Sequence, residues 1–396
     1  MKTKIKNKQE SGITLIALVV TIVVLLILAG VSISLVLNNN GVISKSKGAR
    51  DQYAEAQTND EKQLNEVSDW IDTKVGDTTE KVSEIVDGVP IPADFVYVGG
   101  KKDSGLVISD AKADEGKYKN ATDGKVGTDL VGNQFIWIPV EKIADYKRTA
   151  YSDNFATGTI DTATNSEKIN AYNGSNSEYF IEALPADEKA SVEINKGYYI
   201  GRYEAGDKES TASKTLRTEG TSTSNTITVK AGQAPYNYIN QIDAKSLAEG
   251  FSTKQGYASV KSKLVSSYAW NTAIEFIQKT NTDYGNSSKE GNYANTTFTY
   301  TDITGASQTK AKESAGSGTL IPTGQTTAVN NIYDMGGNVG EWTTEACSNT
   351  DSPYTECGGT CYANFGGNFA NVPAGRRFSS SDVVRETTGF RITLFL

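Results

Sequence analysis

The residue types best suited to metal chemistry lie close together near the C-terminus. Asp334 and Glu341 are seven positions apart, and the turn-forming run Gly336-Gly337-Asn338 lies between them. Adjacent glycines admit backbone angles that are closed to other residues. A compact loop of this kind can aim carboxylates and its own carbonyls at one point, which suits a hard cation such as Ca²⁺. The alternative is a tight turn whose polar side chains satisfy its own backbone.

Other reactive groups are scarce. The 396 residues include no histidine, so the usual general base and the commonest zinc ligand are missing. Neither a Ser/His/Asp triad nor a phosphate-binding loop can be assembled. The three cysteines are Cys347, Cys357 and Cys361. In an extracellular protein we expect one disulfide among them, with its pairing open, and a zinc site is the weaker alternative.

A mixture of aromatic and small polar side chains fills residues 343–388. Aromatic groups give large contact area at low entropic cost, and Asn and Ser give adaptable hydrogen bonds, as in binding paratopes. We predict that this segment binds an extracellular protein or glycan, and that residues 354–382 form one solvent-exposed face. An ordinary loop-rich domain edge is the alternative. The predicted ligand-binding residues are Tyr354, Tyr362, Asn364, Phe365, Asn368, Phe369, Asn371, Arg376, Phe378, Ser380 and Asp382.

Three ordered motifs in this region resemble the formylglycine-generating enzyme (sulfatase-modifying factor) family. Residues 333–342 resemble its GNVWEW core, residues 366–369 its RGGSW motif, and residues 389–394 its terminal GFR strand. The resemblance implies an α+β head with a C-type-lectin-like fold of short strands, two helices and much irregular structure. It also implies a structural Ca²⁺ held by the carboxylates of Asp334 and Glu341 and by the carbonyls of Gly337 and Val339.

The same resemblance speaks against the family's oxidation chemistry. Its enzymes use two copper-holding cysteines just after the GGS motif, and residues 368–377 of this chain contain none. We therefore expect no enzymatic activity, with an enzyme of unknown activity on this fold as an alternative. Residues 343–388 are also similar in composition to the variable proteins of diversity-generating retroelements, which share this fold. Phe365, in place of the family's usual Arg, fits a diversified position.

The N-terminus carries a membrane signal. Four lysines within residues 1–12 precede the uncharged residues 13–37, which as a helix would span about 37 Å and cross a bilayer from a cytoplasmic N-terminus. Gly12 stands before the apolar run, as in prepilin signals, so we expect a prepilin peptidase to cleave between Gly12 and Ile13. Type IV pilins carry Glu where this chain has Ala17, which speaks against filament assembly. A plain membrane anchor is the alternative.

The rest of the chain divides into a stalk and a head. Apolar residues at steps of three or four predict an amphipathic helical stalk and linker over residues 38–89, ended by Pro90 and Pro92. The head occupies residues 90–396, with strands at 95–98, 106–108 and 135–140 and helices at 244–257 and 266–279. Residues 141–190 are predicted to be surface loops.

These features predict a membrane-anchored, ligand-binding protein of the adhesin or receptor kind, with its head outside the cell. The alternative is a structural type IV pilin or pseudopilin, whose partners would be other pilins in a surface filament. Nucleic acid is not an expected partner, because the net charge is −8 and no polybasic run follows the first dozen residues.

Overall fold

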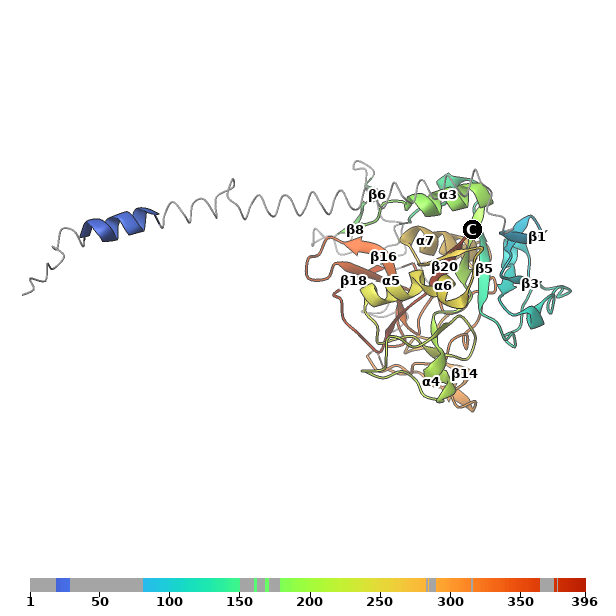
Figure 1. Ribbon diagram of the computed structural model, residues 1–396. Helices are drawn as coiled ribbons and strands as arrows, with labels where there is room; N and C mark the ends of the chain where they lie inside the picture. The colour runs from blue at the N-terminus through green and yellow to red at the C-terminus, as the bar shows by residue number, and fades with distance from the viewer. Residues whose placement is uncertain are drawn as a thin grey trace, which may run out of the picture. The chain divides into compact units, whose positions relative to one another are not determined.

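The computed structural model divides the chain into two compact units, Met1–Thr78 and Thr79–Leu396. It describes residues 19–28, 81–149, 160–161, 168–170, 179–282, 284, 290–314, 316–363, 374–375 and 377–396. Residues 19–28, drawn in blue in Figure 1, are helical, and their apolar side chains are exposed. No helix within the described ranges has the length and apolar character needed to cross a membrane. The predicted cleavage site at Gly12 and Ile13 lies outside these ranges.

The end of the predicted helical stalk is a β-hairpin, so that part of the prediction is wrong. Strand β1 (Val82–Val86) pairs antiparallel with β2 (Val89–Pro92). Asp87 and Gly88 connect them with φ angles of 53° and 75°, the left-handed conformation of the Asp-Gly turns that favour two-residue hairpins. The Asp-Gly turn determines the local structure here, although the spacing of apolar residues predicted a helix. The head therefore begins before Pro90.

A six-stranded antiparallel sheet forms the centre of the head, in the order β13-β20-β9-β5-β4-β3. Successive side chains of β5 enter different cores: Ile136 and Ile138 lie in one hydrophobic cluster, and Phe135 and Trp137 in another. This alternation is the two-residue period of a strand that is covered on both faces. The strands are β3 (Val96–Gly99), β4 (Val107–Ser109), β5 (Gln134–Pro139), β9 (Gly197–Gly201), β13 (Lys261–Leu264) and β20 (Ile392–Phe395).

Helices cover both faces of this sheet. Helix α7 (Ser267–Gln278) contributes to the cluster that contains Ile136, and α5 (Gln241–Glu249) and α6 (Phe251–Gln255) contribute to the other. Helix α7 contacts β5, and α5 and α6 contact β13 (Figure 1). The predicted helix at 266–279 is confirmed. The predicted helix at 244–257 is divided at Gly250. The prediction of loops over 141–190 missed α3 (Ala186–Asn195), and a short α4 (Lys208–Ala212) also forms.

A second sheet carries the C-terminal motifs. Its central strand β16 pairs antiparallel with β17 and β8 and parallel with β19, and β18 forms one edge beside β17. The head is thus a mixed helix-and-sheet domain, as predicted. The strands of this sheet are β6 (Ile160–Asp161), β7 (Lys168–Asn170), β8 (Tyr179–Ile181), β16 (Gly340–Cys347), β17 (Tyr354–Cys357), β18 (Arg377–Ser380) and β19 (Thr388–Phe390).

Small sheets and 3₁₀ turns complete the described head. Strand β10 (Gly206–Asp207) pairs with β11 (Ile227–Thr228) and β12 (Ala234–Pro235). Strands β14 (Phe298–Thr301) and β15 (Ser307–Lys310) form a separate hairpin. The 3₁₀ turns are Lys102–Ser104, Lys112–Asp114 and Ile143–Asp145.

Candidate functional site

The predicted metal-binding turn is a buried and tightly constrained loop. Asp334, Gly337 and Asn338 have φ angles of 56°, 76° and 58°. A Cβ at Gly337 would lie 2.5 Å from the carbonyl oxygen of Asn292, so only glycine fits there. The Asp334 carboxylate accepts hydrogen bonds from the Gly324 amide and the Thr326 hydroxyl, both at 2.6 Å. Its two oxygens thus connect residues 324–326 to the turn through hydrogen bonds.

The second predicted metal-binding carboxylate belongs to an ion pair. Glu341 and Arg391 are both fully buried, and the guanidinium donates to the two carboxylate oxygens at 2.9 and 2.6 Å. Burial raises the pKa of Glu341 above its usual value, while the charge of Arg391 opposes this shift. Arg391 also donates to the carbonyls of Gly201 and Tyr333. The pair therefore joins β16 and the end of β9 to the residue between β19 and β20.

A third carboxylate, Glu204, lies beside these two. Its Oε1 accepts a hydrogen bond from the side chain of Asn338, and among the described residues no donor reaches its Oε2. Burial, together with the charges of Asp334 and Glu341, raises the pKa of Glu204 well above its usual value. Burial and the neighbouring carboxylates thus both disfavour the charged form of Glu204.

The side-chain oxygens of Asp334 and Glu341, which are the predicted Ca²⁺ ligands, do not converge on one point. Asp334 is bonded to residues 324 and 326, and Glu341 is bonded to Arg391. In the part of the chain that the structure describes, no group of three or more acidic, cysteine or histidine side chains is placed to hold a metal ion. Gly337 and Val339 are buried in the same turn. Calcium binding at these four residues stays a prediction.

The cysteines do not form the expected disulfide. No disulfide joins Cys347, Cys357 or Cys361 to another described cysteine, and all three side chains are buried. Cys357 lies opposite Glu341 in the β16–β17 register, and Cys361 packs with Val339. Burial raises the pKa of the Cys357 and Cys361 thiols, which disfavours the reactive thiolate. These two side chains behave as small apolar core residues.

The predicted ligand-binding residues fall into three groups. Asn364, Phe365, Asn368, Phe369, Asn371 and Arg376 lie outside the described residues. Tyr362 and Phe378 are half-buried and line one pocket.

The third group, Tyr354, Ser380 and Asp382, is buried or makes contacts within the fold. The ring of Tyr354 packs edge-on against Trp342 at 6.4 Å between centroids, and Ser380 is buried. Asp382 is exposed, and its carboxylate accepts from the backbone amide of Gln241 at 3.1 Å, at the start of α5.

Residues 354–382 do not form one exposed face, which corrects the prediction. Thr355, Glu356 and Cys357 of β17 are buried because β17 lies between β16 and β18 in the sheet. The composition of this segment matched a binding surface, but the strand in its centre is a core strand. Among the described residues of this segment, Asp382 is exposed and all the others are buried or half-buried.

The pocket that contains Tyr362 and Phe378 has a volume of about 530 Å³, which is within the range of about 300–1,000 Å³ for ligand pockets. Its titratable lining residues include Arg385, whose side chain is 46% exposed, and the buried Glu356; Nη1 of Arg385 lies 3.4 Å from Oε1 of Glu356. Burial raises the pKa of Glu356, and Thr388 donates to its other oxygen at 3.0 Å. Apart from these residues, the lining consists of Gly316, Gly340, Gly359, Thr360, Ala363, Ser379 and Thr387.

The sequence reasoning missed the charged residues of this pocket. Arg385 and Glu356 are 29 positions apart, and their contact depends on the way the chain returns from β18 to β19. One signal was present: Arg385 lies in the loop directly before the closing strand, inside the predicted segment 343–388. The pocket thus combines two aromatic rings, hydroxyl groups, one exposed guanidinium and one buried carboxyl group.

Comparison with known proteins gives one family. The model of the sulfatase-modifying factor enzyme 1-like domain (FGE-sulfatase) matches residues 154–394. No curated protein matches the chain at a significant level. Among solved structures, the crystal structure of CarF is similar at 15% sequence identity, over 51% of this chain and 87% of that chain, with a TM-score of 0.32.

Proposed function

We propose, from the premise that this chain belongs to the sulfatase-modifying factor enzyme 1-like domain family, that its head is a non-catalytic module that binds an external protein. The observation that carries the proposal is the C-terminal pocket, defined by Tyr362, Phe378, Arg385 and Glu356. Aromatic side chains and arginine are the residue types that most often dominate binding energy at protein interfaces. Here they surround one concave site.

The chemistry of the chain supports a binding function over catalysis. Residues 368–377 lack the paired cysteines that the resemblance to the oxidising enzymes would require, and the whole chain lacks histidine. The thiols of Cys357 and Cys361 are buried with raised pKa values, so neither is a ready nucleophile.

The position of β18 favours a protein ligand. It is the edge strand of the second sheet, and two of its residues, Phe378 and Ser379, line the pocket. An edge strand presents backbone donors and acceptors to which an extended peptide can pair, while neighbouring pockets select its side chains. The guanidinium of Arg385 beside the pocket would favour a peptide segment with a carboxylate.

The proposal places this head on the cell surface. A cut between Gly12 and Ile13 would leave the apolar residues 13–37 on the mature chain as a membrane anchor. A structural Ca²⁺ at the 334–341 turn and diversification of residues 343–388 belong to the same proposal. The pilin alternative differs in one testable respect, because it requires the head to pack against copies of itself and to need no external ligand.

The pocket is tested by measuring how tightly the full-length protein and its variants bind to cells or to purified surface proteins. Phe378→Ala and Arg385→Ala should each cost about 2 kcal/mol or more of binding. Val384→Ala is the matched control, since Val384 is 46% exposed, adjacent to Arg385 and outside the pocket lining. All three variants should unfold near the parent temperature. Equal adhesion of the pocket variants and the control would refute the proposed site, and adhesion only to glycans would reassign its ligand.

A further inference from the structure

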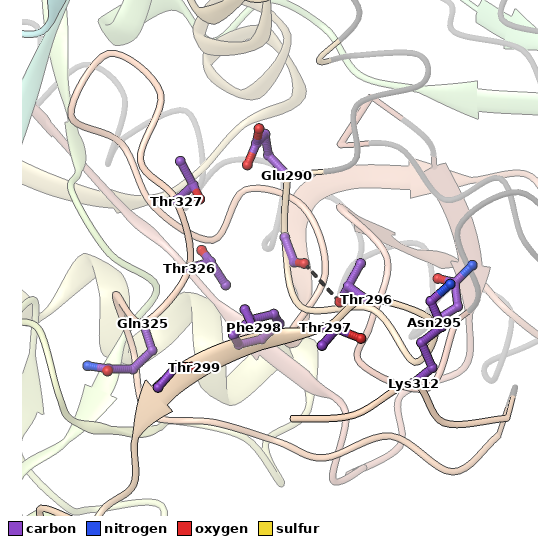
Figure 2. Close-up of a pocket in the computed structure, with 11 residues that line it drawn as sticks. Glu290, Asn295, Thr296, Thr297, Phe298, Thr299, Lys312, Gln325, Thr326 and Thr327 are labelled. Carbon is purple, nitrogen blue, oxygen red and sulfur yellow. Dashed lines mark hydrogen bonds between the residues drawn. The ribbon is translucent and has the colours of Figure 1, made fainter. Parts of the chain in front are cut away.

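A second pocket of about 540 Å³ shares no lining residue with the C-terminal pocket. It is formed by the segment leading into β14, by Lys312 and by residues 325–327. Its lining contains five threonines, two side-chain amides, one aromatic ring, one lysine and one glutamate, and no aliphatic side chain larger than threonine. Figure 2 shows Phe298 in the middle, with Thr326 and Thr327 on one side and Asn295 and Lys312 on the other.

Part of this lining is held rigid by hydrogen bonds within the protein. The Thr296 hydroxyl donates to the carbonyl of Tyr293 at 2.8 Å, and the Thr326 hydroxyl donates to Asp334 at 2.6 Å. Oε1 of Gln325 accepts from the backbone amide of Thr301 at 2.9 Å. That bond fixes the orientation of the Gln325 amide and leaves its Nε2 as a donor.

Four of the remaining polar side chains are open to a ligand. Thr297, Thr299, Thr327 and Lys312 are exposed, and their side chains make no hydrogen bond or ion pair with any residue that the structure describes. A threonine hydroxyl both donates and accepts, as the hydroxyl groups of a sugar do. The half-buried ring of Phe298 adds one flat apolar surface among these groups.

We propose that this pocket binds a neutral saccharide. The hydroxyl and amide groups match the dense hydroxyl pattern of a sugar, and Phe298 offers a ring against which the apolar face of a pyranose can pack. The lining contains one lysine and one glutamate, whose opposite charges cancel, so the pocket has no net charge that would favour an ionic ligand. The site is separate from the proposed protein-binding pocket, and its failure would leave that proposal unaffected.

Saturation-transfer NMR on the full-length protein, kept in a detergent without sugar headgroups, tests the site with cellotriose, maltotriose and triacetylchitotriose as probes. At least one probe should bind. Gln325→Glu keeps the acceptor for Thr301 and removes the Nε2 donor, so it should weaken binding about tenfold. The double substitution Thr299→Val with Thr327→Val should weaken binding by at least as much.

Two control variants separate this site from folding and from the other pocket. Thr309→Val is the matched control, because Thr309 is exposed, lies opposite Thr299 in the β14–β15 register and is outside the pocket lining. It and Phe378→Ala should leave saccharide binding unchanged. The proposal is overturned if no probe binds, if Gln325→Glu binds like the parent, or if trigalacturonic acid, an anionic saccharide, binds more tightly than every neutral probe.

Discussion

Replacing Arg391 with methionine removes the counter-charge of Glu341 and keeps much of the side-chain volume. Both side chains are fully buried, and the guanidinium makes two bonds to the carboxylate and one each to the carbonyls of Gly201 and Tyr333. Breaking a buried pair from one side costs about 3–5 kcal/mol, because the remaining charge has lost its partner. Since domains have about 5–15 kcal/mol of stability in total, Arg391→Met should remove a large share of it.

Urea unfolding of the full-length protein, followed by tryptophan fluorescence at neutral pH, measures this cost. The double variant Arg391→Met with Glu341→Leu is the matched control, because it replaces the whole pair by apolar groups of similar size. Such a replacement is often nearly neutral. The double variant should therefore be more stable than Arg391→Met alone.

The loss should also depend on pH in a defined direction. Burial already holds the pKa of Glu341 above the ordinary 4.5 in the presence of Arg391, and removal of the cation should raise it further. A carboxyl whose pKa is higher in the folded state stabilises that state below its unfolded pKa, and this contribution is lost as the pH rises through the folded pKa. The deficit of Arg391→Met should be smallest near pH 4.5 and largest at neutral pH. A cost below about 1 kcal/mol at neutral pH, or one that does not change with pH, would refute this reasoning.

Three further predictions concern other parts of the chain. Burial, with the charge of Glu345, raises the pKa of Glu182 to about 7, so its stabilising contribution should be lost as the pH rises from 4.5 through 7; Glu182→Gln should equal the parent at pH 4 and be more stable at pH 8 in thermal melts. If Ca²⁺ binds the 334–341 turn, chelator should lower the melting temperature of the parent but not of Asp334→Asn; an unchanged parent would show that the turn binds none. Intact-mass analysis should find Ile13 at the mature N-terminus, and an uncut leader would contradict prepilin processing at Gly12.

The elements that could be predicted from sequence are those whose signal is local. The apolar run at 135–140 predicted β5, and the spacing at 266–279 predicted α7, because each element is buried along nearly its whole length. Helix α3 escaped prediction because Val192 is its only buried apolar residue, which leaves almost no periodic pattern. The β1–β2 hairpin was missed although its Asp-Gly turn signal is as local as any.

The residues of the candidate site are brought together by contacts between distant positions, which no local sequence pattern encodes. The sequence pointed to residues 343–388, and the C-terminal pocket does include Tyr362 and Phe378 from that segment. The composition could not reveal that β17 inside it is a core strand, since burial there follows from pairing with β16 and β18 on both sides. The sequence singled out Asp334 and Glu341 as candidate metal ligands, but it could not show that Glu341 pairs with Arg391, 50 positions away.

The constrained turn at 334–341 contacts both of the proposed pockets. At its start, Asp334 holds the hydroxyl of Thr326, which lines the pocket proposed for a saccharide. Near its end, Gly340 lines the C-terminal pocket, where a Cβ would approach Glu356 to 3.0 Å. One loop thus contributes to a wall of each pocket. Asp334→Asn should then weaken saccharide binding, and Gly340→Ala should impair only binding at the C-terminal pocket.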